Sequence, residues 1–576
     1  MVSEKKQQKG FGKRSNALLS LLIFIVIVIV INLLGNTFFQ RFDLTKEKRF
    51  TLTKSTKNVL ENLDDVVFVQ VFLEGEFPAG FKRLRNGTVE MLNEFRSYAG
   101  SNLQFEFVDP LAGLDDKAKQ EVIQQLYEKG VQPTNLQVKD NDAYSEQIIF
   151  PAALVFYKGR ETAVQLLENK IGQGPQEALN GSLALLEYKF AQAVNILQTP
   201  YKPKVALLQG HSELKPENMQ WMLNIMSKYY TVEQFDINNH LYLPETFKCL
   251  LIAKPREKFN EPDKYKIDQF VMNGGSVLWL IDPMIAEMDS LRNRDAFMSV
   301  GYDLNLDDML FKYGIRLNNN LVQDMMANPV PLMIGMQGNT PQYDLFRWLF
   351  YPVISSADKQ HPISKNLDVV ATKFVSTIDT VKSVGVKKTI LLSTSPYTKV
   401  MFAPVRIHLA AVKEKPNETQ FNKGPQTIAV LLEGQFPSVF ANRLKPNTLA
   451  LTDTVKAFTN RAKSLPGKMI VVADGDIITN DKSSQGESYP TGYYRPTKET
   501  FANQQFLLNC LEYLTDNSGL IESRTREVKL RVLDQGKIKQ QKTFWQVLNL
   551  IVPLLLVSIF GLFYSFLRRK KYAYPK

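Results

Sequence analysis

Two uncharged apolar runs near the ends of the chain constrain its fold more than any other feature. Residues 17–34 and residues 544–566 contain no charged side chain. A helix needs roughly 20 apolar residues to cross about 30 Å of hydrocarbon, so both runs are suited to a membrane span. In the second run Trp545 and Tyr564 lie near the two ends, where aromatic rings favour the headgroup level. We therefore expect two transmembrane helices, with Pro553 tolerated inside the second.

Basic residues flank both runs on the side away from the middle of the chain. Residues 1–16 hold five Lys and Arg against the single acid Glu4, and residues 567–576 hold five more. Because such residues resist translocation, we predict two cytoplasmic tails and a large domain outside the cytoplasm. A cleaved signal peptide is the alternative for the first run, but the exit from Gly35 to Arg41 lacks a small-x-small cleavage pattern.

The two tails supply nine charges of the net charge of +12, which leaves +3 for the rest of the chain. The remaining +3 does not indicate a nucleic-acid partner. We expect the basic tails to meet the membrane, where anionic headgroups attract them.

The two cysteines, Cys249 and Cys510, lie in apolar surroundings. Buried free thiols are the expectation for such positions. A disulfide between them is the alternative outside the cytoplasm.

Between the two runs, short β-branched stretches alternate with helical stripes, which is typical of α/β architecture. In a first domain, residues 41–198, we predict strands at 66–73, 103–108, 147–157 and 161–167, with helices following the first two. This β-α-β-α-β-β order is compatible with a thioredoxin-like sheet, although the absence of Cys-x-x-Cys argues against redox chemistry. A helix at 174–197 is suited to bridging into the next domain.

A second domain is predicted over residues 201–520 as a doubly wound, parallel sheet. Its expected strands are 204–209, 231–235, 249–253, 276–281, 390–392, 428–432 and 469–473, with helices at 262–272 and around Leu507 to Leu514. We expect an inserted lobe at about 300–380 and a polar stalk at 521–543 before the second apolar run.

No enzyme motif is found in the chain. There is no Gly-x-x-x-x-Gly-Lys-Ser/Thr loop for a nucleotide and no Gly-x-Ser-x-Gly elbow. The four histidines, residues 211, 240, 361 and 408, are not at metal-ligand spacing. We therefore predict no catalytic residue, no cofactor and no metal, and a protein that is not an enzyme.

The best candidate site is the edge where the parallel strands of the second domain end, since open α/β sheets bind ligands there. The loop Gly210, His211, Ser212 and Glu213 would meet Lys254, Asp282, Asp474 and Asp476 at this edge. The alternative interpretation is structural, because Asp and Ser after a strand commonly cap a helix and Gly forms the turn.

A short string occurs twice, as Leu73-Glu-Gly-Glu-Phe-Pro78 and Leu432-Glu-Gly-Gln-Phe-Pro437. Each copy leaves an apolar strand. Shared strand-exit chemistry is one explanation, and two partner-binding loops are the other.

Several strings taken together resemble the gliding-motility-associated ABC-transporter auxiliary proteins, the GldG family of Bacteroidetes. They are Asp43-x-Thr45 with Lys48 to Thr53 after the first run, Val205 to Glu213, Asn305 to Gly314, His361 to Ser364, Lys388 to Ser395, Leu432 to Gly434 and Asp474 to Asp476. The resemblance covers nearly the whole chain.

The resemblance implies a periplasmic domain anchored in the bacterial inner membrane. It also implies partners: an ABC permease subunit, a separate ATP-binding subunit and the gliding machinery. The outer domain of the family is similar to the glutamine-amidotransferase-like fold, whose nucleophilic cysteine follows the fourth strand. Here that strand ends Trp279-Leu-Ile-Asp-Pro283, so the nucleophile is absent.

Two main hypotheses remain open from the sequence, and a third, hydrolase activity on cell-envelope material, would need an acid/base pair within reach of one cleft. The first is a non-enzymatic auxiliary, substrate-binding-type subunit of an ABC transporter. The second is a periplasmic receptor for a small molecule or glycan, or an envelope-binding protein, with its cleft near His211 and Glu213.

Overall fold

The computed structural model describes residues 13–37, 51–140, 143–168, 171, 174–292, 294–413, 415–443, 461–483, 485–516, 518–525 and 535–572. The chain divides into two compact units, Met1–Thr53 and Lys54–Lys576. Residues 1–12 of the predicted N-terminal tail, residues 573–576 of the C-terminal tail and the string from Asp43 to Phe50 lie outside the described residues.

Both apolar runs are helical. Helix α1 spans Lys13–Thr37 and contains an apolar stretch at Leu18–Val30, while α10 spans Gln535–Tyr572 and contains one at Gln540–Lys570. Within the described residues, only the stretch in α10, with 31 residues and a mean hydropathy of 2.4, is long and apolar enough to cross a membrane. The long apolar C-terminal helix is thus confirmed, and α10 begins inside the segment predicted as a stalk.

The predicted β-α-β-α-β-β unit forms one four-stranded sheet. Its elements are α2 (Lys54–Glu61), β1 (Val67–Val71), α3 (Ala79–Ala99), β2 (Leu103–Phe107), α4 (Asp116–Glu128), β5 (Ala152–Tyr157) and β6 (Arg160–Gln165). The strand order is β2-β1-β5-β6, with β1 and β2 parallel and the other pairs antiparallel.

One predicted strand of this unit, residues 147–157, is wrong as a single element. It is two strands, β4 (Ala143–Ile149) and β5, and β4 pairs with β3 (Thr134–Asp140) in a separate hairpin. Pro151 lies between them, and a proline has no N–H to donate to a continuous ladder.

The predicted bridging helix is α5, Pro175–Gln198. One side packs on α3 beside the four-stranded sheet, where Phe190 meets Phe95 edge to face at 6.4 Å. The other side reaches α9 (Asn503–Thr515), because Gln192 Nε2 donates to Glu512 at 3.0 Å and the Tyr188 hydroxyl donates to the same carboxylate. The two predicted domains therefore pack against each other through α5.

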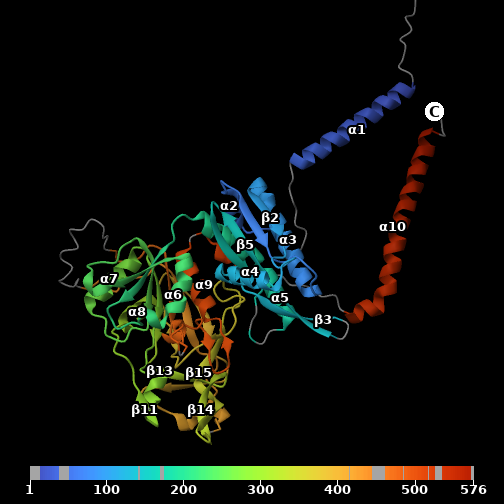
Figure 1. Cartoon of the computed structure of the whole chain (residues 1–576). Helices are drawn as coiled ribbons and strands as arrows, with labels where there is room; N and C mark the ends of the chain where they lie inside the picture. Colours follow the sequence, from blue (N-terminus) through green and yellow to red (C-terminus); the bar gives the residue numbers. More distant parts are fainter. Residues whose placement is uncertain are drawn as a thin grey trace, which may run out of the picture. The chain divides into compact units, whose positions relative to one another are not determined.

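The larger sheet begins with five parallel strands in the order β8-β7-β9-β10-β22. These are β7 (Lys204–Gln209), β8 (Thr231–Asp236), β9 (Phe247–Ala253), β10 (Ser276–Leu280) and β22 (Gly467–Val472). Alternate residues of β7 enter different cores: Ala206 and Leu208 lie with α7 (Glu261–Met272) and α8 (Asp307–Tyr313). Val205 and Leu207 lie with α6 (Gln220–Tyr229) and α9. Helices α6, α7, α8 and α9 of this half are labelled in Figure 1.

The prediction of a wholly parallel, doubly wound sheet is wrong for the other half. There β21 (Thr427–Gly434), β18 (Val386–Ser393), β15 (Thr340–Ser356) and β14 (Ala327–Gln337) continue the sheet with antiparallel pairing. The molecule is a mixed α/β protein with a large mixed sheet. Only Gly338 and Asn339 join β14 to β15, and so short a connection permits antiparallel pairing alone.

The lobe predicted at about 300–380 has different limits. Small two-stranded antiparallel sheets pair β11 (Ala296–Ser299) with β20 (Val405–His408), β12 (Ile315–Leu317) with β17 (Ile378–Thr380), and β13 (Asn320–Asp324) with β19 (Thr398–Phe402). Its core also takes Tyr494 and Phe501 from a distant segment. Shared burial of aromatic side chains, among them Trp348 and Phe374, unites these pieces.

The stalk predicted at 521–543 begins too early. Residues Leu520–Thr525 form a short 3-10 helix whose Ile521 and Arg524 are buried. The Arg524 guanidinium lies 4.9 Å from the centre of the Tyr188 ring. This segment therefore belongs to the folded body.

The two copies of the repeated string share one backbone angle, because Gly75 and Gly434 each have φ of 133°. Gly434 is the last residue of β21, whereas Gly75 lies after the end of β1. Their surroundings differ. A Cβ at Gly434 would overlap the backbone carbonyl of Gly385, whereas a Cβ at Gly75 would meet only the Phe77 ring edge at 3.8 Å. Both copies therefore place a glycine of positive φ at or just after the end of a strand.

We predict that Gly75→Ala lowers the free energy of unfolding by about 1–3 kcal/mol, the cost of holding alanine at this φ. Gly434→Ala should cost more, because the backbone of Gly385 must also move. Thermal unfolding of the detergent-solubilised chain checks this. Equal losses in the two variants would show that the close approach to Gly385 is unimportant.

Candidate functional site

The predicted edge exists, because β7, β9, β10 and β22 are parallel and their carboxyl ends lie at the same end of the sheet. Gly210 to Glu213 follow β7, Lys254 follows β9, Asp282 follows β10 and Asp474 follows β22. Two residues here, Ser212 and Lys254, have positive φ angles of 53° and 52°. Such angles are uncommon outside glycine, and they indicate a backbone that its surroundings hold tightly.

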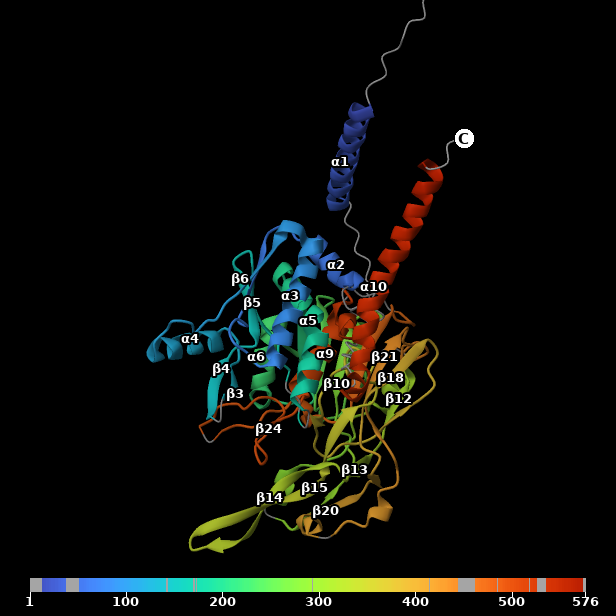
Figure 2. The ribbon, with the colours of Figure 1, turned by 90° about the vertical axis from the view of Figure 1, so that its right-hand side faces the viewer.

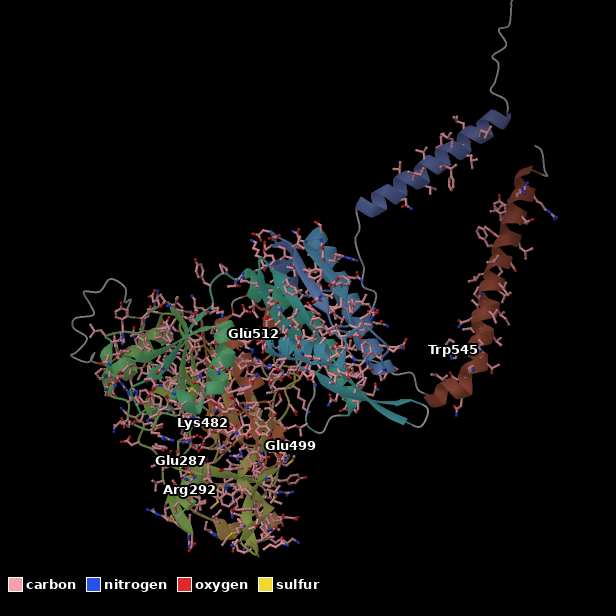
Figure 3. All side chains as sticks on the ribbon, viewed as in Figure 1. Glu287, Arg292, Lys482, Glu499, Glu512 and Trp545 are labelled. Carbon is pink, nitrogen blue, oxygen red and sulfur yellow. The ribbon has the colours of Figure 1, made fainter. Side chains whose placement is uncertain are left out.

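Lys254 is the centre of one cluster at this edge. Its ammonium is 2.6 Å from Asp476 Oδ1, 3.1 Å from Asp282 Oδ2 and 3.6 Å from Glu287 Oε1. Glu287 is labelled in Figure 3. Only 3% of Lys254 is exposed. Burial alone lowers the pKa of an amine, but these carboxylates outweigh it and raise the pKa of Lys254 above its usual value.

The carboxyl groups of this cluster respond to the same burial. Burial raises the pKa of Asp282 to about 6, although Lys254 opposes the shift. Burial and the neighbouring Asp282 raise the pKa of Asp474 well above its usual range. Asp474 accepts hydrogen bonds from the backbone N–H groups of Lys373 and Asp476, at 3.1 and 2.7 Å.

Gly475 permits the close approach that this cluster needs. A Cβ at this position would lie 2.7 Å from the Cβ of Lys254. The Gly475 N–H donates to the Asp282 carboxylate. The predicted string Asp474-Gly475-Asp476 therefore packs directly against Lys254 and belongs to its cluster.

His211 is the centre of a second cluster. Its Nδ1 is 3.4 Å from Glu213 Oε1 and its Nε2 is 3.3 Å from Asp263 Oδ2. The ring stacks on Phe259 with 3.7 Å between the ring centres. Lys266 Nζ contacts the other Asp263 oxygen at 2.8 Å. The arrangement places the imidazole between two carboxylates, which favour its protonated form.

The pKa values of this cluster follow from that geometry. Burial lowers the pKa of His211, but Asp263 and Glu213 outweigh burial and raise it above its ordinary value. Burial raises the pKa of Asp263, but His211 and Lys266 outweigh burial and lower it. The cluster therefore consists of mutually supporting charges.

Sequence reasoning named His211 and Glu213 but missed Asp263, Lys266 and Glu287. Asp263 carries one local signal, since the Asn260 side chain accepts its N–H at 2.8 Å and caps α7. That signal indicates a helix start and says nothing about His211, which lies 52 positions earlier in numbering. The contact depends on how α7 packs on the sheet.

The edge offers little space for a ligand. His211 is 2% exposed and Glu213 is 6% exposed. A cavity of about 40 Å³ lies beside Asp476 and is lined by Lys373, Tyr493 and Asn503 among others. Sites for drug-sized molecules are typically about 300–1,000 Å³, so this cavity suits only a few waters. In the described part of the chain, no group of three or more His, Cys, Asp or Glu could hold a metal ion.

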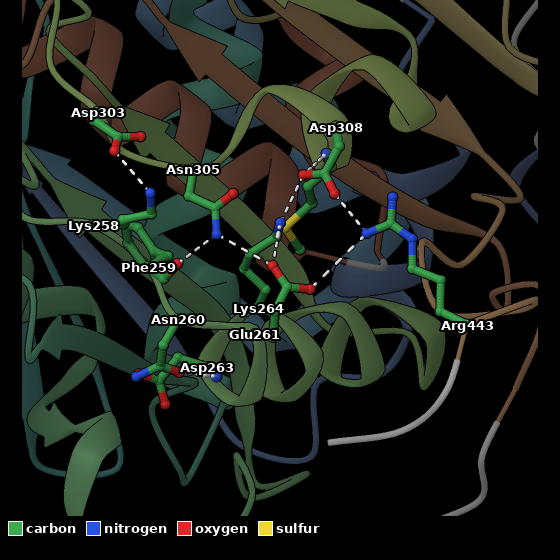
Figure 4. A network of polar contacts seen from close by, with 11 residues as sticks. Lys258, Phe259, Asn260, Glu261, Asp263, Lys264, Asp303, Asn305, Asp308 and Arg443 are labelled. Carbon is green, nitrogen blue, oxygen red and sulfur yellow. Dashed lines mark hydrogen bonds and ion pairs between the residues drawn. The ribbon is translucent and has the colours of Figure 1, made fainter. Parts of the chain in front are cut away.

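A third network links α7 and α8 (Figure 4). The fully buried Lys264 contacts Asp308 at 2.7 Å and Glu261 at 3.0 Å, and Arg443 contacts Asp308 at 2.6 Å. Asn305 Nδ2 donates to the Phe259 carbonyl at 2.8 Å. The string Asn305 to Gly314 thus has a packing role.

Both cysteines are buried free thiols, as expected, and the alternative of a disulfide is wrong. Burial raises the pKa of Cys249 to about 12. A thiol that stays protonated is a poor nucleophile.

Residues 202–510 match a protein-family model described as an ABC-type uncharacterized transport system, and residues 46–156 match a domain of unknown function. An uncharacterized protein of Borreliella burgdorferi is 21% identical over 569 residues, which cover 97% of this chain and 99% of the relative. Among solved structures, the mmIFT52 N-terminal domain is 13% identical and covers 55% of this chain and 98% of its own, with a TM-score of 0.30. A ThuA-like protein of Parabacteroides merdae is 9% identical, with 57% and 93% covered and a TM-score of 0.25.

We predict that Lys254→Met destabilises the protein by about 3–5 kcal/mol at pH 8, because it leaves buried carboxylates without their cation. The loss should be smaller at pH 5, where Asp282 is protonated. Lys258→Met is the matched control, because its pair with Asp303 is exposed and worth about 0–1 kcal/mol. Denaturant unfolding at the two pH values is the measurement, and a loss no larger than that of the control would contradict the prediction.

We also predict a pH-dependent contribution from His211. A pKa raised by folding means that the ring stabilises the fold when protonated; this stability is present below the ordinary pKa of about 6.5 and is lost as pH rises through the folded pKa. His211→Gln should therefore lower the melting temperature more at pH 5.5 than at pH 8.5. The exposed His240→Gln serves as control, and an equal loss at both pH values would argue that the ring is uncharged.

Proposed function

The chain belongs to the family described as an ABC-type uncharacterized transport system, and from this premise we propose that it is a membrane-anchored, non-enzymatic auxiliary subunit of an ABC transporter. The family match over residues 202–510 carries the proposal. That range contains the whole of the parallel half of the large sheet and the antiparallel half joined to it.

The membrane anchors support this role. We propose that α1 and α10 both span the bacterial inner membrane, with both termini cytoplasmic and the folded body in the periplasm. The apolar stretch of α10 and the basic residues after it support the second span, and Lys13 and Arg14 precede the apolar stretch of α1. The finer assignment, to the GldG family and gliding motility, rests on the sequence strings alone.

The finer fold assignments also remain our proposal. The order β2-β1-β5-β6 supports a thioredoxin-like N-terminal domain. The parallel half of the large sheet, which lacks a cysteine after β10, supports a glutamine-amidotransferase-like domain without its nucleophile.

Other chains would supply ATP hydrolysis and the path through the membrane. The sequence has no phosphate-binding Gly-x-x-x-x-Gly-Lys-Ser/Thr loop, so a separate ATP-binding subunit would supply hydrolysis. A multi-span permease would supply the path, and α10 would pack against it. The charges at the sheet edge would then hold the body rigid.

The receptor hypothesis gains no support from the candidate site. His211 and Glu213 are buried and pair with each other, and the neighbouring cavity holds about 40 Å³. A small-molecule or glycan receptor would need the edge to open.

The test is co-purification of the tagged, full-length chain in mild detergent. We expect mass spectrometry to find one ATP-binding subunit and one multi-span subunit with it. A matched chimera, in which residues 544–566 are replaced by an unrelated apolar span, should lose most of both partners while remaining in the membrane. If the wild-type chain recovers neither subunit above the level of an unrelated tagged membrane protein, the proposal fails.

A further inference from the structure

The outer parts of β14 and β15 form a two-stranded ribbon that extends beyond the rest of the lobe (Figure 2). Several large apolar side chains on it are more than 45% exposed: Met333, Ile334, Met336, Tyr343 and Leu345. Exposed apolar side chains scattered singly need no explanation, but a continuous group does.

The strand register places four of these side chains, Met333, Met336, Tyr343 and Leu345, on one face, whereas Ile334 is the extra residue at a register shift. Across the ribbon, Pro331 pairs with Leu345, Met333 with Tyr343, and Met336 with Pro341. Met333 and Met336 would point to opposite faces of a regular strand, since side chains alternate. The register shift between Met333 and Gly335 inserts one residue and returns Met336 to the face of Met333.

The other face of the ribbon is mostly polar over the same length, apart from Leu332. There Leu332 pairs with Asp344, Gly335 with Gln342, and Gln337 with Thr340. The bulge therefore creates an amphipathic ribbon whose apolar face is uncovered in the monomer.

β14 is also the last strand of the large sheet, so one side of its backbone is an open edge. Near its start this edge is closed: the Tyr494 hydroxyl donates to the Pro329 carbonyl, and Pro329 and Pro331 have no N–H to offer. Residues 332–337, Leu-Met-Ile-Gly-Met-Gln, contain neither proline nor charge. No other described strand pairs with them apart from β15.

We propose that this edge is a self-association surface, where residues 332–337 of two copies of the chain pair antiparallel about a two-fold axis. An isologous contact of this kind needs a self-complementary surface, and an open strand edge provides donors and acceptors for its own copy. The two apolar faces then join into one four-stranded surface. This inference goes beyond the proposed transporter role and does not depend on it.

The charges favour a second copy over a lipid surface. Between Ala327 and Phe346 the only charged side chain is Asp344, on the polar face. Interfacial elements that bind anionic membranes carry Lys and Arg on the polar face. A ribbon without cations has no such attraction. When β14 pairs with β14 of a second copy, no charged side chain lies in the contact, since Asp344 is on β15.

Cysteine cross-linking of the full-length chain in detergent tests the geometry. The native Cys249 and Cys510 are completely buried, so an added surface cysteine reacts alone. In the proposed pairing Met333 of one copy lies opposite Met336 of the other, so the double variant Met333→Cys with Met336→Cys should form a disulfide-linked dimer under mild oxidation. Val384→Cys, at a residue 84% exposed on another loop, is the matched control and should not.

A second measurement uses the paired variant Met333→Lys with Met336→Lys, which places like charges across the proposed edge. Wild-type chain should have twice the protein mass of 65.7 kDa in detergent, and the variant should dissociate about tenfold more readily or more. Val384→Lys should behave as wild type, and equal melting temperatures confirm that each variant folds. A monomeric wild type, a dimer that survives both lysines, or a cross-link to a different protein would each overturn the proposal.

Discussion

The ammonium of Lys254 is the charge around which the end of the large sheet is organised. Placing an amine and its carboxylates out of water costs several kcal/mol for each ion, and close geometry must offset that cost. The geometry is supplied by segments far apart in sequence, since Asp282 follows β10 and Asp476 follows β22. These strands and their loops cannot shift independently without separating buried charges. The lobe is included, because Lys373 donates its N–H to Asp474.

The same logic explains most strings that resemble the auxiliary-protein family. Asp308 neutralises the fully buried Lys264, and Asn305 holds the Phe259 carbonyl. The His361 segment is fixed by Asn509, whose side-chain amide donates to the Ile363 carbonyl at 2.8 Å. Residues that look like a functional signature therefore satisfy buried charges and backbone groups. Function is expected on the outer surfaces that this framework holds in place.

The buried framework also includes the junction of α5, α9 and the last segment of the body. Glu512 accepts the Tyr188 hydroxyl, Arg524 lies over the same ring, and burial raises the pKa of Glu512 to about 7. The body ends at Thr525 and α10 begins at Gln535. An anchor so near this junction suits an auxiliary subunit that stays beside its transporter.

The sequence by itself determined the elements whose signal is local: the apolar helix α10, the continuous apolar strands β7, β9 and β10, the bridging helix α5 and the buried thiols. It also indicated that Lys254, Asp282 and Asp476 would share an edge, because parallel strands end together. Only the tertiary structure decided that β21, β18 and β15 run antiparallel, that Asp263 reaches His211, and that a bulge turns Met336 onto the face of Met333. Each of these depends on which distant segments pair and in what register, and local hydrophobic periodicity does not encode that choice.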